Sequence, residues 1–160
     1  MDGNELIGRL KAWHAAIEAE DLEYAEAVES EDVTLGIEDR GVVSSRFVCR
    51  FASGRVRFDG EILLDGIYGD AEDHAAARDN ELATLEMAIT LLAADAKGFA
   101  WLKNDPAATV DVMARERSCG YRISDGSDTM VEAGSDWRGL IARLDTVGIA
   151  GAPDGMIIRP

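Results

Sequence analysis

The sequence predicts an α+β fold, in which an antiparallel sheet packs against helices. One observation is that residues 41–68 alternate apolar and polar side chains, as strands with one buried face do. The other is that the segments on either side repeat apolar residues every three or four positions, which is the helical period. With 160 residues, of which 47% are hydrophobic, the chain has the size of one domain, and we expect residues 1–160 to share one core.

The N-terminal part is predicted to be two helices followed by a strand. A helix over residues 4–20 buries a stripe of apolar side chains at spacings of four, three and four. The stripe consists of Leu6, Leu10, Trp13 and Ile17. Asp21 then caps a short second helix that reaches Val28. Alternating apolar residues follow, so the sheet is expected to cover about residues 33–68.

Within the sheet we expect a hairpin with an apolar face and an arginine face. An even loop, of two residues at Ala52-Ser53 or of four from Phe51 to Gly54, keeps the two kinds of side chain apart and sets Arg50 opposite Arg55. A three-residue loop would mix the faces. Like charges directly opposite each other cost roughly 0.2 to 1 kcal/mol per pair, so an anionic group is expected over the arginine face. The apolar face comprises Phe47, Cys49, Phe51, Val56 and Phe58. The arginine face comprises Arg46, Arg50, Arg55 and Arg57.

The second half is predicted to add three helices and a short later hairpin. A long helix over residues 71–97 carries a leucine-rich stripe that covers the sheet. A helix over residues 105–118 is expected because an Asn-Asp-Pro sequence precedes it, which is a strong helix start. The later hairpin pairs residues 121–123 with residues 129–131, and a last helix covers residues 135–147.

The charge of the chain limits its partners. A formal net charge of −15 disfavours direct binding to nucleic acid or to an anionic membrane, because both attract positive charge. The two cysteines, Cys49 and Cys119, lie far apart without metal-ligand spacing, and no apolar run reaches the roughly 18 residues of a membrane span. We therefore expect a reduced, soluble protein of the cytoplasm.

An acidic segment is the main candidate for a binding surface. Residues 18–39 hold ten acids and no Lys or Arg, which favours a non-enzymatic module that docks on a basic protein partner. In a narrower form this resembles the inhibitors that mimic nucleic acid with arrays of Asp and Glu. A structural role as a homo-oligomer is a further alternative to this binding function. The predicted acidic surface consists of Glu18, Glu20, Asp21, Glu23, Glu26, Glu29, Glu31 and Asp32.

The arginine face supports an alternative interpretation, a small enzyme or ligand-binding domain with an anion site. The site would consist of Arg46, Arg50, Arg55 and Arg57. The simpler expectation for these side chains is pairing within the chain, in which at least two of them contact carboxylates, some from residues 18–39.

Histidine and cysteine, two residue types that catalysis often uses, occur only twice each in this chain. His14 borders the apolar stripe of the first helix, and Asp70 and His74 share a face near the start of the long helix, where the helix dipole already favours acids. Cys119 is expected at a helix C-terminus, which disfavours a thiolate. We therefore expect no catalytic residue, no metal site and no cofactor, and the balance lies against an enzyme.

Overall fold

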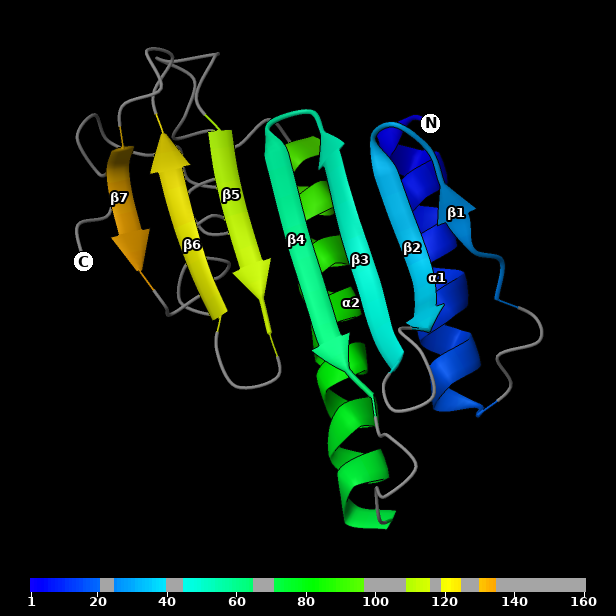
Figure 1. Ribbon diagram of the computed structural model, residues 1–160. Helices are drawn as coiled ribbons and strands as arrows, with labels where there is room; N and C mark the ends of the chain where they lie inside the picture. The colour runs from blue at the N-terminus through cyan, green and yellow to red at the C-terminus, as the bar shows by residue number, and fades with distance from the viewer. Residues whose placement is uncertain are drawn as a thin grey trace.

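The computed structural model describes residues 1–20, 25–39, 45–64, 71–96, 109–115, 119–124 and 130–134. Within these residues two helices pack on one face of a sheet, which confirms the predicted α+β class (Figure 1). The helices are α1 (Gly3–Glu18) and α2 (Ala71–Ala96). The strands are β1 (Val28–Glu29), β2 (Val33–Asp39), β3 (Ser45–Ser53), β4 (Val56–Leu63), β5 (Thr109–Ala114), β6 (Cys119–Ser124) and β7 (Met130–Gly134).

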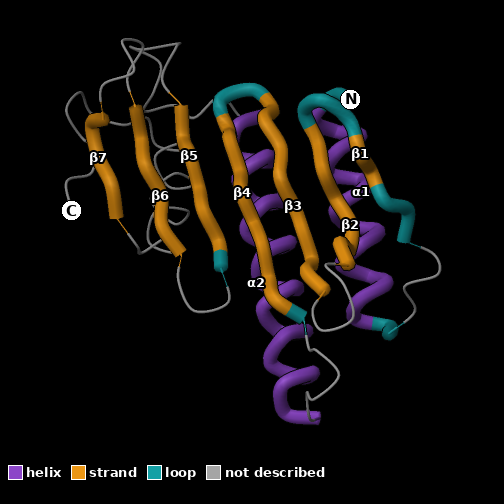
Figure 2. Tube along the Cα trace, viewed as in Figure 1, coloured by secondary structure: helices purple, strands orange, loops and turns teal. Residues whose placement is uncertain are grey.

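The seven described strands lie in the sheet in the same order as in the sequence (Figures 1 and 2). Every neighbouring pair is antiparallel except β4 and β5, which are parallel. A parallel pair needs a crossover connection, and the segment that contains α2 provides it. This crossover brings residues 109–124 next to the hairpin of β3 and β4.

Helix α1 follows the predicted stripe. Asp2 caps it, since the side chain accepts a hydrogen bond of 2.7 Å from the backbone N–H of Glu5. Its predicted apolar residues are all buried, and the Trp13 ring lies 5.9 Å from that of Phe47 on the sheet. The indole N–H of Trp13 also donates to the carbonyl of Glu26 at 2.8 Å, which ties the segment before β1 to the helix.

Helix α2 lies across β3 and β4, as predicted for the long helix, and packs beside α1 (Figure 1). It approaches β4 closely at Gly60. A Cβ atom there would lie 2.8 Å from the methyl group of Thr84, so only glycine permits this packing. Leu85, Ala88 and Leu91 are fully buried or nearly so between helix and sheet, and each buried Leu contributes on the order of 1.5 to 3 kcal/mol.

Neither α1 nor α2 has the length and the apolar run needed to cross a lipid bilayer.

Two of the predicted helices are wrong in the described residues. The helix expected over residues 105–118 is strand β5 at residues 109–114, because Val110, Val112 and Ala114 alternate onto the buried face. The short helix through Val28 is also wrong, since Val28–Glu29 is strand β1. The later hairpin is confirmed as β6 and β7. The helix predicted over residues 135–147 lies outside the described residues.

The hairpin of β3 and β4 keeps the predicted faces but has a different register. The turn is formed by Gly54 and Arg55, so Ser53 pairs with Val56 and Arg50 pairs with Asp59 instead of Arg55. Gly54 has φ +57°, a conformation that favours glycine and suits a two-residue turn. The predicted register was wrong by four residues, but the loop is even, so the two faces stay separate.

Candidate functional site

The sheet face opposite α1 and α2, which we call the outer face, carries the candidate site. The register assigns alternate side chains to it across four strands, for example Arg50 on β3, Asp59 on β4, Met113 on β5 and Gly120 on β6, all directly opposite one another. The intervening residues face the helices and are buried, among them Phe51, Phe58, Val112 and Tyr121. The outer face therefore presents charged side chains around a few apolar ones.

A network of ion pairs occupies the part of the outer face over β3 and β4. Arg50 donates to Asp59 Oδ1 from Nε at 3.0 Å and to Glu61 Oε2 from Nη2 at 2.9 Å. Arg46 also donates to Glu61, and Arg115 reaches Asp59 Oδ2 at 3.1 Å. Glu61 is the most deeply buried member, with 12% of its side chain exposed.

The network fixes the charge states of its carboxylates. Hydrogen bonds from Arg46 and then Arg50 outweigh the effect of burial and hold the pKa of Glu61 below its usual value. Burial opposes ionisation of Asp59, but hydrogen bonds from Arg115 and Arg50 outweigh it, so the pKa of Asp59 is lowered as well. Both groups are therefore ionised at neutral pH.

The prediction that at least two hairpin arginines pair with carboxylates is confirmed by Arg46 and Arg50. The carboxylates of these ion pairs come from β4, because the true register turns Asp59 and Glu61 onto the arginine face. Glu38 lies directly opposite Arg46 across β2 and β3. Arg55 lies in the turn, where its backbone N–H donates to Asp95 at 3.3 Å.

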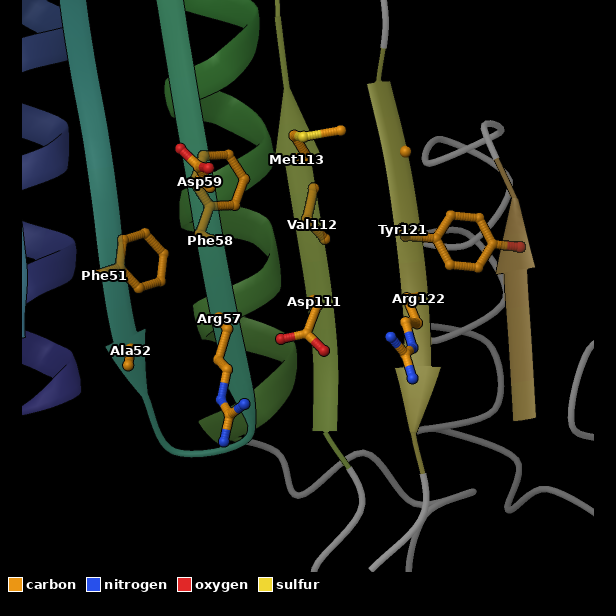
Figure 3. Close-up of a pocket in the computed structure, with 11 residues that line it drawn as sticks. Phe51, Ala52, Arg57, Phe58, Asp59, Asp111, Val112, Met113, Tyr121 and Arg122 are labelled. Carbon is orange, nitrogen blue, oxygen red and sulfur yellow. The ribbon is translucent and has the colours of Figure 1, made fainter. Parts of the chain in front are cut away.

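A second group of charges lies at the other side of the face, in the row Arg57, Asp111 and Arg122. These residues stand directly opposite one another on β4, β5 and β6 (Figure 3). Arg57 and Arg122 are exposed. Among the residues that the structure describes, no carboxylate lies within ion-pair distance of either guanidinium group.

Beside this row lies an open hollow of about 440 Å³. Met113 is one of its lining residues, with 51% of its surface exposed, and Gly120, directly opposite Met113, has no side chain to fill the space. The lining residues come from four adjacent strands and are Phe51, Ala52, Arg57, Phe58, Asp59, Asp111, Val112, Met113, Gly120, Tyr121 and Arg122 (Figure 3).

The predicted acidic residues lie at two ends of α1. Glu18 and Glu20 lie at its C-terminal end, where they contact His14 Nδ1 at 3.5 Å and Arg78 at 2.8 Å, respectively. Glu29, Glu31 and Asp32 lie at the β1–β2 turn, near the N-terminal end of the helix (Figure 1). Glu26 pairs with Arg9. Asp21 and Glu23 lie outside the described residues.

The remaining candidates for chemistry are dispersed. His14 lies between the helices with Glu86 at 3.0 Å from Nε2. Cys119 begins strand β6, so the expected helix C-terminus is wrong. The side chains of Asp70 and His74 lie outside the described part. Within the described residues no three His, Cys, Asp or Glu side chains are placed to hold a metal ion, and Cys49 is a buried free thiol whose pKa burial raises.

Comparison of the chain with protein-family models, with curated proteins and with solved structures gave no match. The geometry of the outer face therefore carries the functional argument. Sequence reasoning missed Asp111, Met113, Gly120 and Arg122, because it placed the first two in a helix. The alternation of Val110 and Val112 with polar residues would have assigned this segment to a strand.

Proposed function

We propose that this protein is a non-enzymatic binding module whose outer face receives an anionic ligand with an apolar body. The observation that carries the proposal is the pair of exposed guanidinium groups, Arg57 and Arg122, which have no described carboxylate partner and flank a hollow that contains the half-exposed Met113. This is the predicted anion site in a changed form. Of the four predicted arginines, Arg57 stays in the site, and Arg122 joins it from β6.

The size and chemistry of the hollow support a small ligand. A volume of about 440 Å³ lies within the range of roughly 300 to 1,000 Å³ that is typical of small-molecule sites. Guanidinium groups bind carboxylates through charge-assisted hydrogen bonds, which are about twice as strong as neutral ones. Met113 offers a flexible and polarisable apolar surface that adapts to different shapes. Together they favour a ligand with one anionic and one apolar end.

The charge states on this face support binding without catalysis. A general base that works at neutral pH needs a pKa near the operating pH. The ion pairs of Asp59 and Glu61 instead hold the pKa of both groups below their usual values. These carboxylates therefore act as fixed structural charges, which keep Arg46, Arg50 and Arg115 in place beside the hollow.

Octanoate tests the proposal, because it joins a carboxylate to a short alkyl chain. We expect calorimetry to show saturable binding that Arg57→Gln and Arg122→Gln each weaken about tenfold, the effect of losing roughly 1.4 kcal/mol of a charged hydrogen bond. Arg78→Gln removes the same charge from α2, on the other side of the sheet, and should leave the affinity unchanged. Equal affinities of all four proteins would overturn the proposal.

A second candidate function is docking of the acidic surface on a basic protein partner. The observation in its favour is that Glu29, Glu31 and Asp32 are exposed together at the β1–β2 turn, without a cation partner among the described residues. Exposed charges of this kind steer association, and salt screens them over about 8 Å at physiological ionic strength. Nucleic-acid mimicry is the narrower form of this candidate.

The acidic candidate predicts that association with its partner slows as salt rises. The triple variant Glu29→Gln, Glu31→Gln and Asp32→Asn should show a lower association rate at low salt and a weaker salt dependence than the unchanged protein. The paired acid Glu26 provides the matched control through Glu26→Gln. A partner whose association rate is the same at low and high salt would exclude this surface as the interface.

A further inference from the structure

We infer that Asp111 makes the hollow selective for singly charged anions, so that its ligands are carboxylates on an apolar chain rather than phosphate monoesters. The inference rests on the proposed function and names the ligand class of the same site. Asp111 would then be a specificity-determining residue, since its carboxylate lies between the two guanidinium groups that hold the ligand.

The register gives Asp111 this position. It lies directly opposite Arg57 on the parallel strand β4 and directly opposite Arg122 on the antiparallel strand β6. Neighbouring strands are about 4.7 to 4.9 Å apart, so the three charged groups form one continuous row (Figure 3). The row has two positive charges and one negative charge, and its sum of +1 matches a monoanion.

The other described residues of the outer face add no positive charge to the site. Arg46, Arg50 and Arg115 are balanced by Asp59 and Glu61, which they contact, and by Glu38, which lies opposite Arg46. Glu29 on β1, opposite Thr34, adds a further negative charge to the same face. The chain as a whole has a net charge of −15, and its field disfavours a second negative charge on a ligand. A dianion would therefore meet Asp111 and the chain's own potential, and the described residues of this face offer no further unpaired cation to compensate for its second charge.

The apolar end of the ligand has a defined place beside the row. Met113 follows Asp111 by two residues on the same face of β5 and lies opposite Gly120, which has no side chain to fill the space. The hollow of about 440 Å³ would hold roughly fifteen water molecules at ~30 Å³ each, which is ample room for a short alkyl chain. Each methylene group buried there contributes about 0.8 kcal/mol.

Three probes with the same alkyl chain test the selectivity at pH 8: octanoate, octyl phosphate and octanol. Octyl phosphate is doubly charged at this pH, because the second pKa of a phosphate monoester is near 6. We expect the unchanged protein to bind octanoate about tenfold or more tightly than either of the other probes. Asp111→Asn keeps the shape and removes the charge, and it should increase the affinity for octyl phosphate about tenfold more than that for octanoate.

The outcomes separate this inference from the proposed function. If octanoate binds and depends on Arg57, but Asp111→Asn changes the affinities for both anions by the same factor, the selectivity role is overturned and the binding site stands. A preference of the unchanged protein for octyl phosphate also overturns it, and that comparison needs no variant. If octanoate binds no better than octanol, the proposed function itself fails.

Discussion

Arg50 on β3 lies directly opposite Asp59 on β4, and its Nε donates a hydrogen bond of 3.0 Å to the carboxylate. The alternation of the sequence places several arginines on one face of the hairpin, where their like charges repel one another. The pairing of Arg50 with Asp59 reduces this repulsion. The carboxylates of Asp59 and Glu61 share the face and neutralise most of it. Arg57 and Arg122, farther along the face, have no carboxylate within ion-pair distance among the described residues, and they are the groups that we propose bind a ligand.

Glu61→Gln should destabilise the protein by roughly 1 to 3 kcal/mol at pH 7. Glu61 accepts hydrogen bonds from Arg46 and Arg50, and the loss of its charge removes one ionised partner from each of these two half-buried cations, while Arg50 keeps Asp59. Urea denaturation measures the loss. Glu31→Gln is the control, since Glu31 is exposed and its replacement should change the free energy of unfolding by less than ~0.5 kcal/mol.

The unchanged protein and Glu61→Gln also test how the stability that Glu61 provides depends on pH. The pKa of Glu61 is lowered by folding, so its contribution is present above the ordinary value of 4.5 and is lost as the pH falls through the folded pKa. The stability difference between the unchanged protein and Glu61→Gln should therefore shrink in acid. A difference that grows between pH 6 and pH 3 would contradict the network.

Glu81→Gln should stabilise the protein at pH 8. Glu81 is 7% exposed on α2, and burial raises its pKa from 4.5 to about 7. A raised pKa means that the folded state prefers the protonated acid, so stability is lost as the pH rises through about 7. At 1.36 kcal/mol per unit, the gain at pH 8 should be on the order of 2 to 3 kcal/mol and should shrink as the pH falls from about 7 toward 4.5.

Thermal or urea unfolding from pH 5 to pH 8 checks this expectation. Asp79→Asn, which removes an exposed carboxylate from the same helix, is the matched control variant. If Glu81→Gln has the same effect at pH 5 and at pH 8, then Glu81 does not titrate in this range.

Gly54→Ala and Gly8→Ala should change stability in opposite directions. Gly54 has φ +57°, and a Cβ atom there would lie 1.9 Å from Oδ2 of Asp95, which accepts a hydrogen bond from the Arg55 backbone. We expect a loss of about 1 to 3 kcal/mol. Gly8 lies inside α1 with no atom within 4 Å of an added Cβ, so alanine should stabilise the helix by up to ~1 kcal/mol. Urea midpoints that move in the same direction would contradict this account of the turn.

Local sequence patterns predict the elements whose apolar residues recur at regular spacing. They miss the elements whose structure depends on residues far away in the sequence. The stripe of α1 and the leucines of α2 gave both helices nearly to the residue. Residues 109–114 were misassigned because an Asn-Asp-Pro helix start precedes them and because Val110, Met113 and Ala114 also fit a helical stripe. The alternation of Val110 and Val112 favours a strand, and the parallel pairing with β4, which forms through the α2 crossover, decides between the two patterns.

The site was predictable only in part for the same reason. Alternation in residues 46–58 assigned Arg57 to a charged face. This assignment is correct although the predicted register was wrong by four residues, because a shift by an even number of residues leaves each side chain on the same face of the sheet. The partners of the arginines depend on the register itself, which follows from the two-residue turn of Gly54 and Arg55, where the Arg55 backbone N–H donates to Asp95. Asp111 and Arg122 reach the same face only through β5 and β6, far along the chain.

Amide chemical shifts on titration with octanoate test the central claim most directly, because they report where the ligand lies. The account predicts that the largest changes fall on Arg57, Asp111, Met113 and residues 120–122, with little change along α1 and α2. It also predicts that octanol at the same concentration gives much smaller changes at Arg57 and Arg122. Shifts that concentrate on the helices, or an octanoate titration that leaves β4, β5 and β6 unchanged, would contradict the proposed site.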